Sequence, residues 1–320
     1  MKEMRNIIRY MAIAMLPIVS ACEHKDLCFE QTHKQDIEVV FDWQKAPDAS
    51  PESMALYLYD TDKGGEPIRY IFTGRDGGHI TVPYGRYEAL CKNSDDTDWV
   101  QIRNTSDVDA FETYTPDATD NTAVLSGQTA TMSRDDNNEE RTEATPGMLW
   151  SDRQSGFEVN YTDTHKVLTL YPEEAVCHYT VVFENVDNIV NLNGGAVDGT
   201  LDGMAEGFLH GSKQPTENKV KMPFKLIPDE NAGTLTAQFL TFGECQADGN
   251  DDSIVVSVPL ADGDMWTQTF DVTDQVHDAT DPHHVKIVIK GLELPEKEIN
   301  AGGLHPDVDE WEEENIGIKM

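Results

Sequence analysis

The densest group of potential metal ligands in the sequence lies near its C-terminal end, where His277, Asp278, Asp281, His283 and His284 fall within eight residues. Imidazole nitrogens and carboxylate oxygens of this kind could coordinate a zinc ion. The same segment carries the Thr, Asp and Pro residues of a turn and leads into a strand, in which neighbouring side chains point to opposite faces. At most one of His283 and His284 can therefore face a given site, and a turn is favoured over a metal site.

Three acidic runs could recruit calcium, but local structure explains each of them better. Residues 248–252 (DGNDD) and 262–264 (DGD) tolerate positive φ angles and are typical of hairpin turns. Residues 135–140 (DDNNEE) have neither the glycine nor the regular oxygen spacing of a calcium-binding loop, so we expect a solvated loop there. The sequence therefore predicts no metal and no cofactor.

Catalytic motifs are not found in the sequence. It has no GxSxG nucleophile motif, no GxxxxGK[ST] phosphate loop and no GxGxxG dinucleotide motif. Glycoside hydrolysis needs a pair of carboxylates. In a chain with 59 Asp and Glu residues, any chosen pair could arise by chance and so does not indicate such an activity. We therefore predict a protein that is not an enzyme and has no small-molecule substrate.

The composition excludes two further classes of protein. A formal charge of -35 would repel phosphate backbones, which are bound by Lys and Arg, so the chain is not expected to bind nucleic acid. Hydrophobic residues make up 38% of the chain and aromatic residues 8%, which is enough for folded cores and excludes general disorder.

Residues 1–21 have the features of an export signal. Lys2, Arg5 and Arg9 form a positive start, and a short apolar run at 11–19 follows. The sequence VSAC, which ends at Cys22, resembles a bacterial lipobox, after which the signal is removed and the cysteine carries acyl chains. An ordinary secretory signal that happens to contain a cysteine, or a buried helix, is the alternative. The lipobox predicts attachment to outer-membrane lipid through Cys22.

The residues after Cys22 are expected to be a tether, at 22–35. Removing residues 1–21 takes away three basic residues and one acidic residue, which changes the charge from -35 to -37. Such a body would be held off an anionic membrane surface, so the lipid must supply the attachment. The segment EHKD at 23–26 resembles export signals of surface lipoproteins in the Bacteroidetes group. We expect a lipid-anchored protein exposed on the cell's outer membrane.

Apolar residues alternate with polar ones in the first half of the mature chain. Ile37, Val39, Phe41 and Trp43 share one face, a period typical of a half-buried strand. Similar segments at 54–60, 68–72 and 79–93 are separated by Gly, Asp and Pro. This spacing predicts an antiparallel β-sandwich at 36–160, which includes an acidic loop region at 93–146.

The alternation resumes at Lys166 and predicts seven to nine further strands. Cys177, Tyr179, Val181 and Phe183 share one face of the clearest of them. The fold class is therefore all-β, with two tandem antiparallel β-sandwich domains, the second at 161–320. None of the cysteines 28, 91, 177 and 245 has metal-binding spacing, and their disulfide state is open. Cys91 and Cys177 alternate with apolar residues, so we expect them in the core.

The order of four motifs resembles one known family. They are the lipobox, VPYGRYEALCKN at 82–93, LDGMA at 201–205 and VDEW at 308–311. Together they are similar to the Bacteroidales fimbrillin-like lipoproteins, which include subunits, tip proteins and anchors of type V pili. The resemblance implies two transthyretin-like sandwich domains and assembly with other fimbrial subunits by exchange of a β-strand.

One departure from the family suggests the type of subunit. Stalk subunits are freed by cleavage at an Arg after the first strand, but here the first Arg after the signal is Arg69. The resemblance thus implies an unprocessed, lipid-retained anchor or accessory subunit. The candidate assembly residues lie in the first and last strands: Ile37, Val39, Phe41, Trp43, Trp311, Ile316 and Ile318. The alternative for these residues is plain core packing.

A different class of function is also compatible with the sequence. A surface lipoprotein could capture a glycan or a protein without polymerising, with an exposed aromatic such as Trp99 or Trp266 as its binding platform. The sequence alone leaves this alternative open.

Overall fold

A computed structural model of the chain provides the fold. It describes residues 33–94, 100–115, 145–162, 165–192, 195–246, 249, 251–260 and 264–296, and the backbone alone at 123–125, 128–130 and 141–142. The predictions for the signal segment, for Cys22, Cys28, Trp99, Trp311, Ile316 and Ile318, and for most of the acidic loop lie outside these residues. In the described part, no helix is long and apolar enough to cross a membrane.

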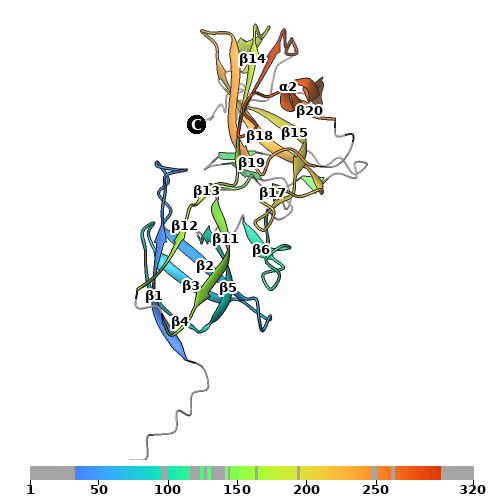
Figure 1. Ribbon diagram of the computed structural model, residues 1–320. Coiled ribbons are helices and arrows are strands. Elements are labelled where there is room, and N and C mark those ends of the chain that lie inside the picture. Colours follow the sequence, from blue (N-terminus) through green and yellow to red (C-terminus); the bar gives the residue numbers. More distant parts are fainter. Residues whose placement is uncertain are drawn as a thin grey trace, which may run out of the picture.

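The first sandwich consists of two sheets that enclose one core (Figure 1). One sheet has the order β12-β1-β4 and the other the order β13-β11-β5-β2-β3. The strands are β1 (Lys34–Phe41), β2 (Ser53–Asp60), β3 (Ile68–Thr73), β4 (Gly77–Pro83), β5 (Gly85–Asn93), β11 (Trp150–Val159), β12 (Lys166–Leu170) and β13 (Glu173–Glu174). Alternate side chains of each inner face fill the space between the sheets, as the period-two pattern predicts.

Strand β12 packs with the first sandwich, although the sequence pattern placed its residues in the second. The sequence assigned residues from 161 onward to the second sandwich, but β12 pairs in parallel with β1, from Ile37 opposite Lys166 to Phe41 opposite Leu170. Leu168 and Leu170 are fully buried in the first core. The division into domains stays a prediction, and this pairing favours a boundary between Leu170 and β14.

The motif at 82–93 forms a corner between the two sheets of the first sandwich. Strand β4 ends at Pro83 and β5 begins at Gly85. The hydroxyl of Tyr87 donates a hydrogen bond to the carbonyl of Pro83 at 2.8 Å, and its ring is buried. A tyrosine that bonds back to the preceding turn in this way fixes the angle at which the chain changes sheets.

The second sandwich is one continuous path of strands that bends around a second core. Its order is β21-β20-β15-β18-β19-β14-β22, with β10 (Arg141–Thr142) paired beside β18. The strands are β14 (Cys177–Glu184), β15 (Val197–Ala205), β18 (Lys219–Asp229), β19 (Thr234–Thr241), β20 (Ser253–Pro259), β21 (Met265–Asp271) and β22 (His284–Lys290). The motif at 201–205 contains a bulge, where Gly203 has a φ of +92° that glycine adopts without strain.

A small sheet joins the two halves of the chain. It has the order β17-β16-β7-β6, in which β6 (Gln101–Arg103) and β7 (Glu112–Tyr114) pair with β16 (Gly207–Leu209) and β17 (Gln214–Pro215). The Arg103 guanidinium donates two hydrogen bonds to Glu112, at 2.6 and 2.7 Å, and one to Glu206, at 3.2 Å. Hydrogen bonds and charge therefore connect strands that lie a hundred residues apart.

The remaining elements are short. A hairpin of β8 (Ala123–Leu125) and β9 (Gln128–Ala130) forms a sheet of its own, and helical structure in the described part is confined to η2 (Ile189–Leu192) and α2 (Thr273–His277). The prediction of an all-β fold with two sandwiches is confirmed. Its strands are mostly antiparallel, except for the parallel pairs β1–β12, β10–β18 and β14–β22.

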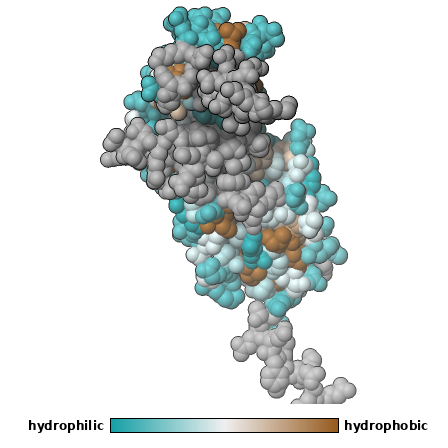
Figure 2. Space-filling model, turned by 180° about the vertical axis from the view of Figure 1, so that it is seen from behind, coloured by the Kyte–Doolittle hydropathy of each residue, from teal (hydrophilic) through white to brown (hydrophobic). Residues whose placement is uncertain are grey.

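Apolar residues reach the surface as separate patches. Figure 2 shows brown patches divided by hydrophilic surface on one side of the molecule. The large apolar side chains that are exposed are Ile71, Tyr161, Val167, Tyr171, Val190, Ile227 and Met265. Most of them stand singly, which is normal for a folded surface, so a binding face has to be sought in the strand edges and clusters.

Candidate functional site

The first strand, which carries four candidate assembly residues, is enclosed by its own sandwich. Strand β1 pairs with β12 on one edge and with β4 on the other. Ile37, Val39 and Phe41 are buried in the first core, and Trp43 packs edge-on against Trp150 at 6.1 Å. Core packing therefore accounts for these side chains, and their part in assembly stays a prediction.

Strand β21 ends one side of the second sandwich. It pairs with β20, and no further described strand follows it. Trp266 and Phe270 pack against the second core but are only half-buried, and no strand of the described residues lies beyond β21 to cover them. Trp266 therefore lies on an outermost strand and is partly exposed, and its part in a binding platform stays a prediction.

Strand β22 ends the other side, and its edge is protected. Lys286 and Lys290 are exposed along it, and charged lysines are a common protection against unwanted strand pairing. The side-chain oxygen of Gln275, on α2, accepts a hydrogen bond from the backbone N–H of Val288 at 2.8 Å. One outward backbone donor of β22 is thus already satisfied within the chain.

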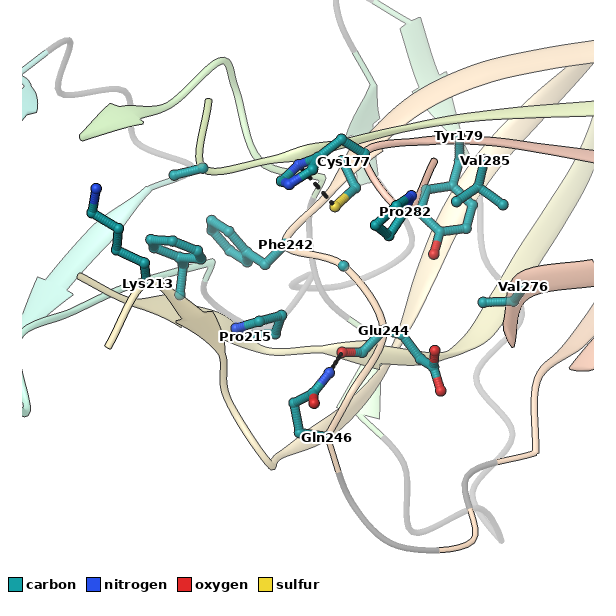
Figure 3. A pocket seen from close by; sticks show the side chains of 14 residues that line it. Cys177, Tyr179, Lys213, Pro215, Phe242, Glu244, Gln246, Val276, Pro282 and Val285 are labelled. Atoms are coloured by element: carbon teal, nitrogen blue, oxygen red, sulfur yellow. Dashed lines mark hydrogen bonds between the residues drawn. The ribbon is translucent and has the colours of Figure 1, made fainter. Parts of the chain in front are cut away.

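A cavity of about 210 Å³ lies where β14, the end of β19 and the segment before β22 meet (Figure 3). The sulfur of Cys177 lies 3.9 Å from Nδ1 of His283, an arrangement that could suggest a cysteine nucleophile. Burial, reinforced by the charges of Asp281 and Glu174, raises the pKa of the Cys177 thiol to about 12. The thiol is therefore protonated at neutral pH and is a poor nucleophile.

The three histidines near the C-terminal end face three different surroundings. His283 faces Cys177, whereas the ring of His284 stacks on His178 with centroids 5.0 Å apart. His277, at the end of α2, lies beside two carboxylates. The prediction that His283 and His284 do not share a site is confirmed. The sequence did not indicate that each would meet partners from distant strands.

Within the described residues, this arrangement produces two clusters of metal-ligating atoms. One joins Glu174, His178 and His284, and the other joins Glu244, Asp252 and His277. In each, the three ligand atoms lie within 4.8 Å of one another. The sequence treated Asp252 only as part of a turn and did not single out Glu244, since neither lies near His277 in the chain. No local signal could have found these clusters.

The electrostatics of the second cluster are unusual. Burial, followed by the charge of Glu244, raises the pKa of Asp252 to about 7, while His277 and Lys219 act in the opposite direction. The side chain of Asp252 is fully buried, while those of Glu244 and His277 are partly exposed. The cluster therefore has one enclosed ligand and two ligands at the surface.

The cysteines in the described part are buried. Cys91, Cys177 and Cys245 have 0%, 8% and 1% of their surface exposed. Cys91 lies in the first core cluster and Cys177 in the second, so the prediction that both are core residues is confirmed. Burial also raises the pKa of the Cys91 thiol far above its usual range, which makes it unreactive.

Comparison with protein families gives one match. The family described as Domain of unknown function (DUF5119) matches residues 21–225, which is more than half of the chain. Among curated protein sequences, none is significantly similar.

Solved structures with the same architecture come from Bacteroides and Porphyromonas. A candidate adhesin from Bacteroides ovatus has a TM-score of 0.61 at 17% identity, covering 81% of this chain and 94% of that chain. The fimbrial anchor protein Mfa2 from Porphyromonas gingivalis has a TM-score of 0.51 at 13% identity, with coverages of 81% and 91%. A candidate polysaccharide-binding protein from Bacteroides thetaiotaomicron has a TM-score of 0.51 at 11% identity, with coverages of 83% and 96%. The resemblance to fimbrillin-like proteins is confirmed at the level of the fold.

Proposed function

We propose that this chain, which belongs to the family Domain of unknown function (DUF5119), is a non-catalytic surface lipoprotein that serves as an anchor or accessory subunit of a fimbria. Acyl chains on Cys22 would hold it at the outer membrane, and strand addition would join it to other fimbrial subunits. The fold shared with a fimbrial anchor protein supports this proposal, although a shared fold alone does not assign a function.

The outer edge of β21, which pairs with no strand in the part of the chain that the structure describes, is the observation that carries the proposal. The core-facing side chains Trp266 and Phe270 are half-buried, whereas Val285, Ile287 and Ile289 of β22 at the other end are buried. An extended strand from a second subunit, placed beside β21, would cover both aromatic rings. Its backbone would satisfy the open donors and acceptors, and its alternate side chains would set the register.

The hydrogen bonds of the β20–β21 pair identify the donors at the open edge. The N–H of Val272 donates to Asp252, and the N–H of Leu260 donates to Asp264. Because such bonds recur at every second residue of an antiparallel pair, the even-numbered residues of β21 face β20. The N–H groups of Thr267 and Thr269 therefore point away from β20, toward the open edge.

Proline substitutions at these two positions test strand addition. Thr267→Pro and Thr269→Pro each remove one outward N–H and leave the bonds to β20 in place. In the producing bacterium we expect loss of surface fimbriae by electron microscopy and loss of co-purified fimbrial subunits. Thr267→Val and Thr269→Val are the matched controls, because they keep the N–H.

The folded state of each variant is checked by circular dichroism of the purified protein. If a proline variant unfolds, Thr269→Lys places a charge on the same edge without altering the backbone. Normal fimbriae in the folded proline and lysine variants alike would contradict strand addition at β21.

Membrane attachment requires a separate test. Cys22→Ala removes the thiol of the predicted lipobox, so we expect the protein to leave the outer-membrane fraction. Unchanged sedimentation with outer membranes would refute lipid anchoring through Cys22. Cys28→Ala, six residues further along, is the matched control.

Capture of a glycan or a protein without polymerisation is the second candidate function. One similar structure is described as a candidate polysaccharide-binding protein, which favours this alternative only at the level of the fold. A strain that lacks this chain but assembles normal fimbriae would favour capture over assembly.

A further inference from the structure

We infer that Glu244, Asp252 and His277 form a binding site for a divalent transition-metal ion, most suitably zinc. Nε2 of His277 lies 2.8 Å from Oε1 of Glu244 and 3.3 Å from Oδ2 of Asp252. The inference concerns the second sandwich alone and does not depend on a role in fimbriae.

The distances match the geometry of a zinc site. Zinc binds histidine nitrogen and carboxylate oxygen at about 2.0–2.2 Å, in a tetrahedral arrangement. Ligand atoms at the corners of such a tetrahedron are about 3.3–3.6 Å apart. The His277–Asp252 distance of 3.3 Å falls in this range, and the His277–Glu244 distance of 2.8 Å needs only a small side-chain movement.

The ligands are held by the surrounding structure. The backbone N–H of Asp252 donates to the hydroxyl of Thr273 at 3.0 Å, and its carbonyl accepts from the N–H of Val272 at 3.0 Å. His277 is the last residue of α2, whose Val276 is buried in the second core. Glu244 lies in a backbone bridge opposite Met204. Ligands fixed on three separate segments lose little freedom when an ion binds.

The charges at the site favour a cation. Two carboxylates face a single imidazole, and the side chain of Asp252 is fully buried. An ion with two positive charges would neutralise both carboxylates. The large negative charge of the whole chain also raises the local concentration of cations.

The donor set selects the type of metal. A histidine nitrogen disfavours calcium and magnesium, which prefer oxygen ligands alone. One imidazole and two carboxylates suit zinc and leave a fourth position for water. His277 and Glu244 are 40% and 30% exposed, so this position is open to solvent.

The alternative is a direct contact of His277 with the two carboxylates, with no ion between them. The other cluster provides the matched control. Nε2 of His178 lies 3.4 Å from Oε2 of Glu174, and Nδ1 of His284 lies 3.0 Å from Asp281. All of these side chains are at least one-third exposed, so none of them supplies an enclosed ligand.

The test uses the untagged mature chain, stripped of metal, with Zn²⁺ and Co²⁺ as probes. We expect Zn²⁺ binding with one ion per chain by isothermal titration calorimetry, and the strong visible absorption of tetrahedral Co²⁺. His277→Gln should weaken Zn²⁺ binding at least about tenfold and abolish the tetrahedral Co²⁺ spectrum. His284→Gln should leave both unchanged.

Zn²⁺ should also raise the unfolding temperature of the wild-type chain and of His284→Gln, but not of His277→Gln, because only a ligand of the folded state stabilises it. His277 is partly exposed, so its replacement should not prevent folding. Equal Zn²⁺ affinity of the wild-type chain and His277→Gln would overturn the inference. So would a Co²⁺ spectrum that is lost in His284→Gln and kept in His277→Gln.

Discussion

The two sandwiches share one feature, but β1 is an inner strand of its sheet whereas β21 is an outermost strand. Each contains a parallel strand pair, β1–β12 in the first and β14–β22 in the second. In the first sandwich, Phe41 is 4% exposed and its ring meets Phe72 edge-on at 5.4 Å. In the second, Phe270 makes the same kind of contact with Phe183 at 5.2 Å but stays half-buried on the outermost strand.

The difference shows that the amphipathic pattern of a strand does not reveal whether its backbone is free to pair with a strand of another subunit. Strand β1 has the more apolar pattern, yet its backbone is paired on both edges. Strand β21 carries fewer apolar residues but keeps one edge open in the described structure. If the chain assembles by strand addition, we expect β21, and not β1, to supply the contact.

The largest effect should come from truncating the two matched phenylalanines. Phe41→Ala leaves a cavity in a closed core and should lower the free energy of unfolding by about 3–5 kcal/mol. Phe270→Ala should cost only about 1–2 kcal/mol, because the ring still meets water in the folded state. Urea denaturation of both variants measures the two costs. Equal losses would contradict the contrast between the two sandwiches.

The junction between the sandwiches should show the next largest effect. The side chains of Glu112 and Glu206 are only 6% and 3% exposed. Arg103→Met removes the positive charge that Arg103 places beside both of them. Breaking a buried ion pair costs about 3–5 kcal/mol, and we expect about 2 kcal/mol here because Arg103 is partly exposed. Arg69→Met, on the exposed side of β3, is the control. Denaturation that matches the control would show that charge does not stabilise the junction.

The sequence predicted the strands whose apolar residues alternate. Residues 36–43 and 54–60 correspond to β1 and β2, and each of the two predicted alternating faces lies in one core cluster. Alternation is a local property, so it can be read without knowing which strands pair.

The sequence did not predict what depends on distant partners. Strand β11 is polar at its centre and was not expected to be a strand, but Asp152 is buried there with the Lys213 ammonium 2.8 Å away. Strand β12 joins the first sheet because of its pairing with β1, more than 120 residues earlier. The cluster of Glu244, Asp252 and His277 forms for the same reason. Only folding brings such residues together.

Acid should weaken the junction selectively through His210. Its ring is buried against Phe111 and Phe208, and burial with the charge of Lys92 lowers its pKa from 6.5 to about 3. The unfolded chain takes up a proton below pH 6.5 that the folded chain does not bind, so this contribution is present above pH 6.5 and is lost as the pH falls toward 3.

The expected loss is at most about 1.4 kcal/mol for each pH unit between 6.5 and 5. His210→Leu removes the titrating group, so its free energy of unfolding should fall less steeply over this range than that of the wild-type chain. Denaturation at several pH values measures the two slopes. Parallel slopes would show that His210 does not titrate in this way.

The smallest change in stability should come from the protected edge of β22. Replacing Lys286 and Lys290 by Thr removes two exposed charges from a strand whose inward side chains are already buried, so the free energy of unfolding should change by less than about 0.5 kcal/mol. The edge would lose its electrostatic protection against a second chain, and we expect concentration-dependent dimers by light scattering.

The same pair of substitutions at Lys63 and Lys166, outside β22, should leave the chain monomeric. If the β22 variant also stays monomeric, then the hydrogen bond from Val288 to Gln275 is sufficient to protect this edge, and Gln275→Ala in the same background should release it.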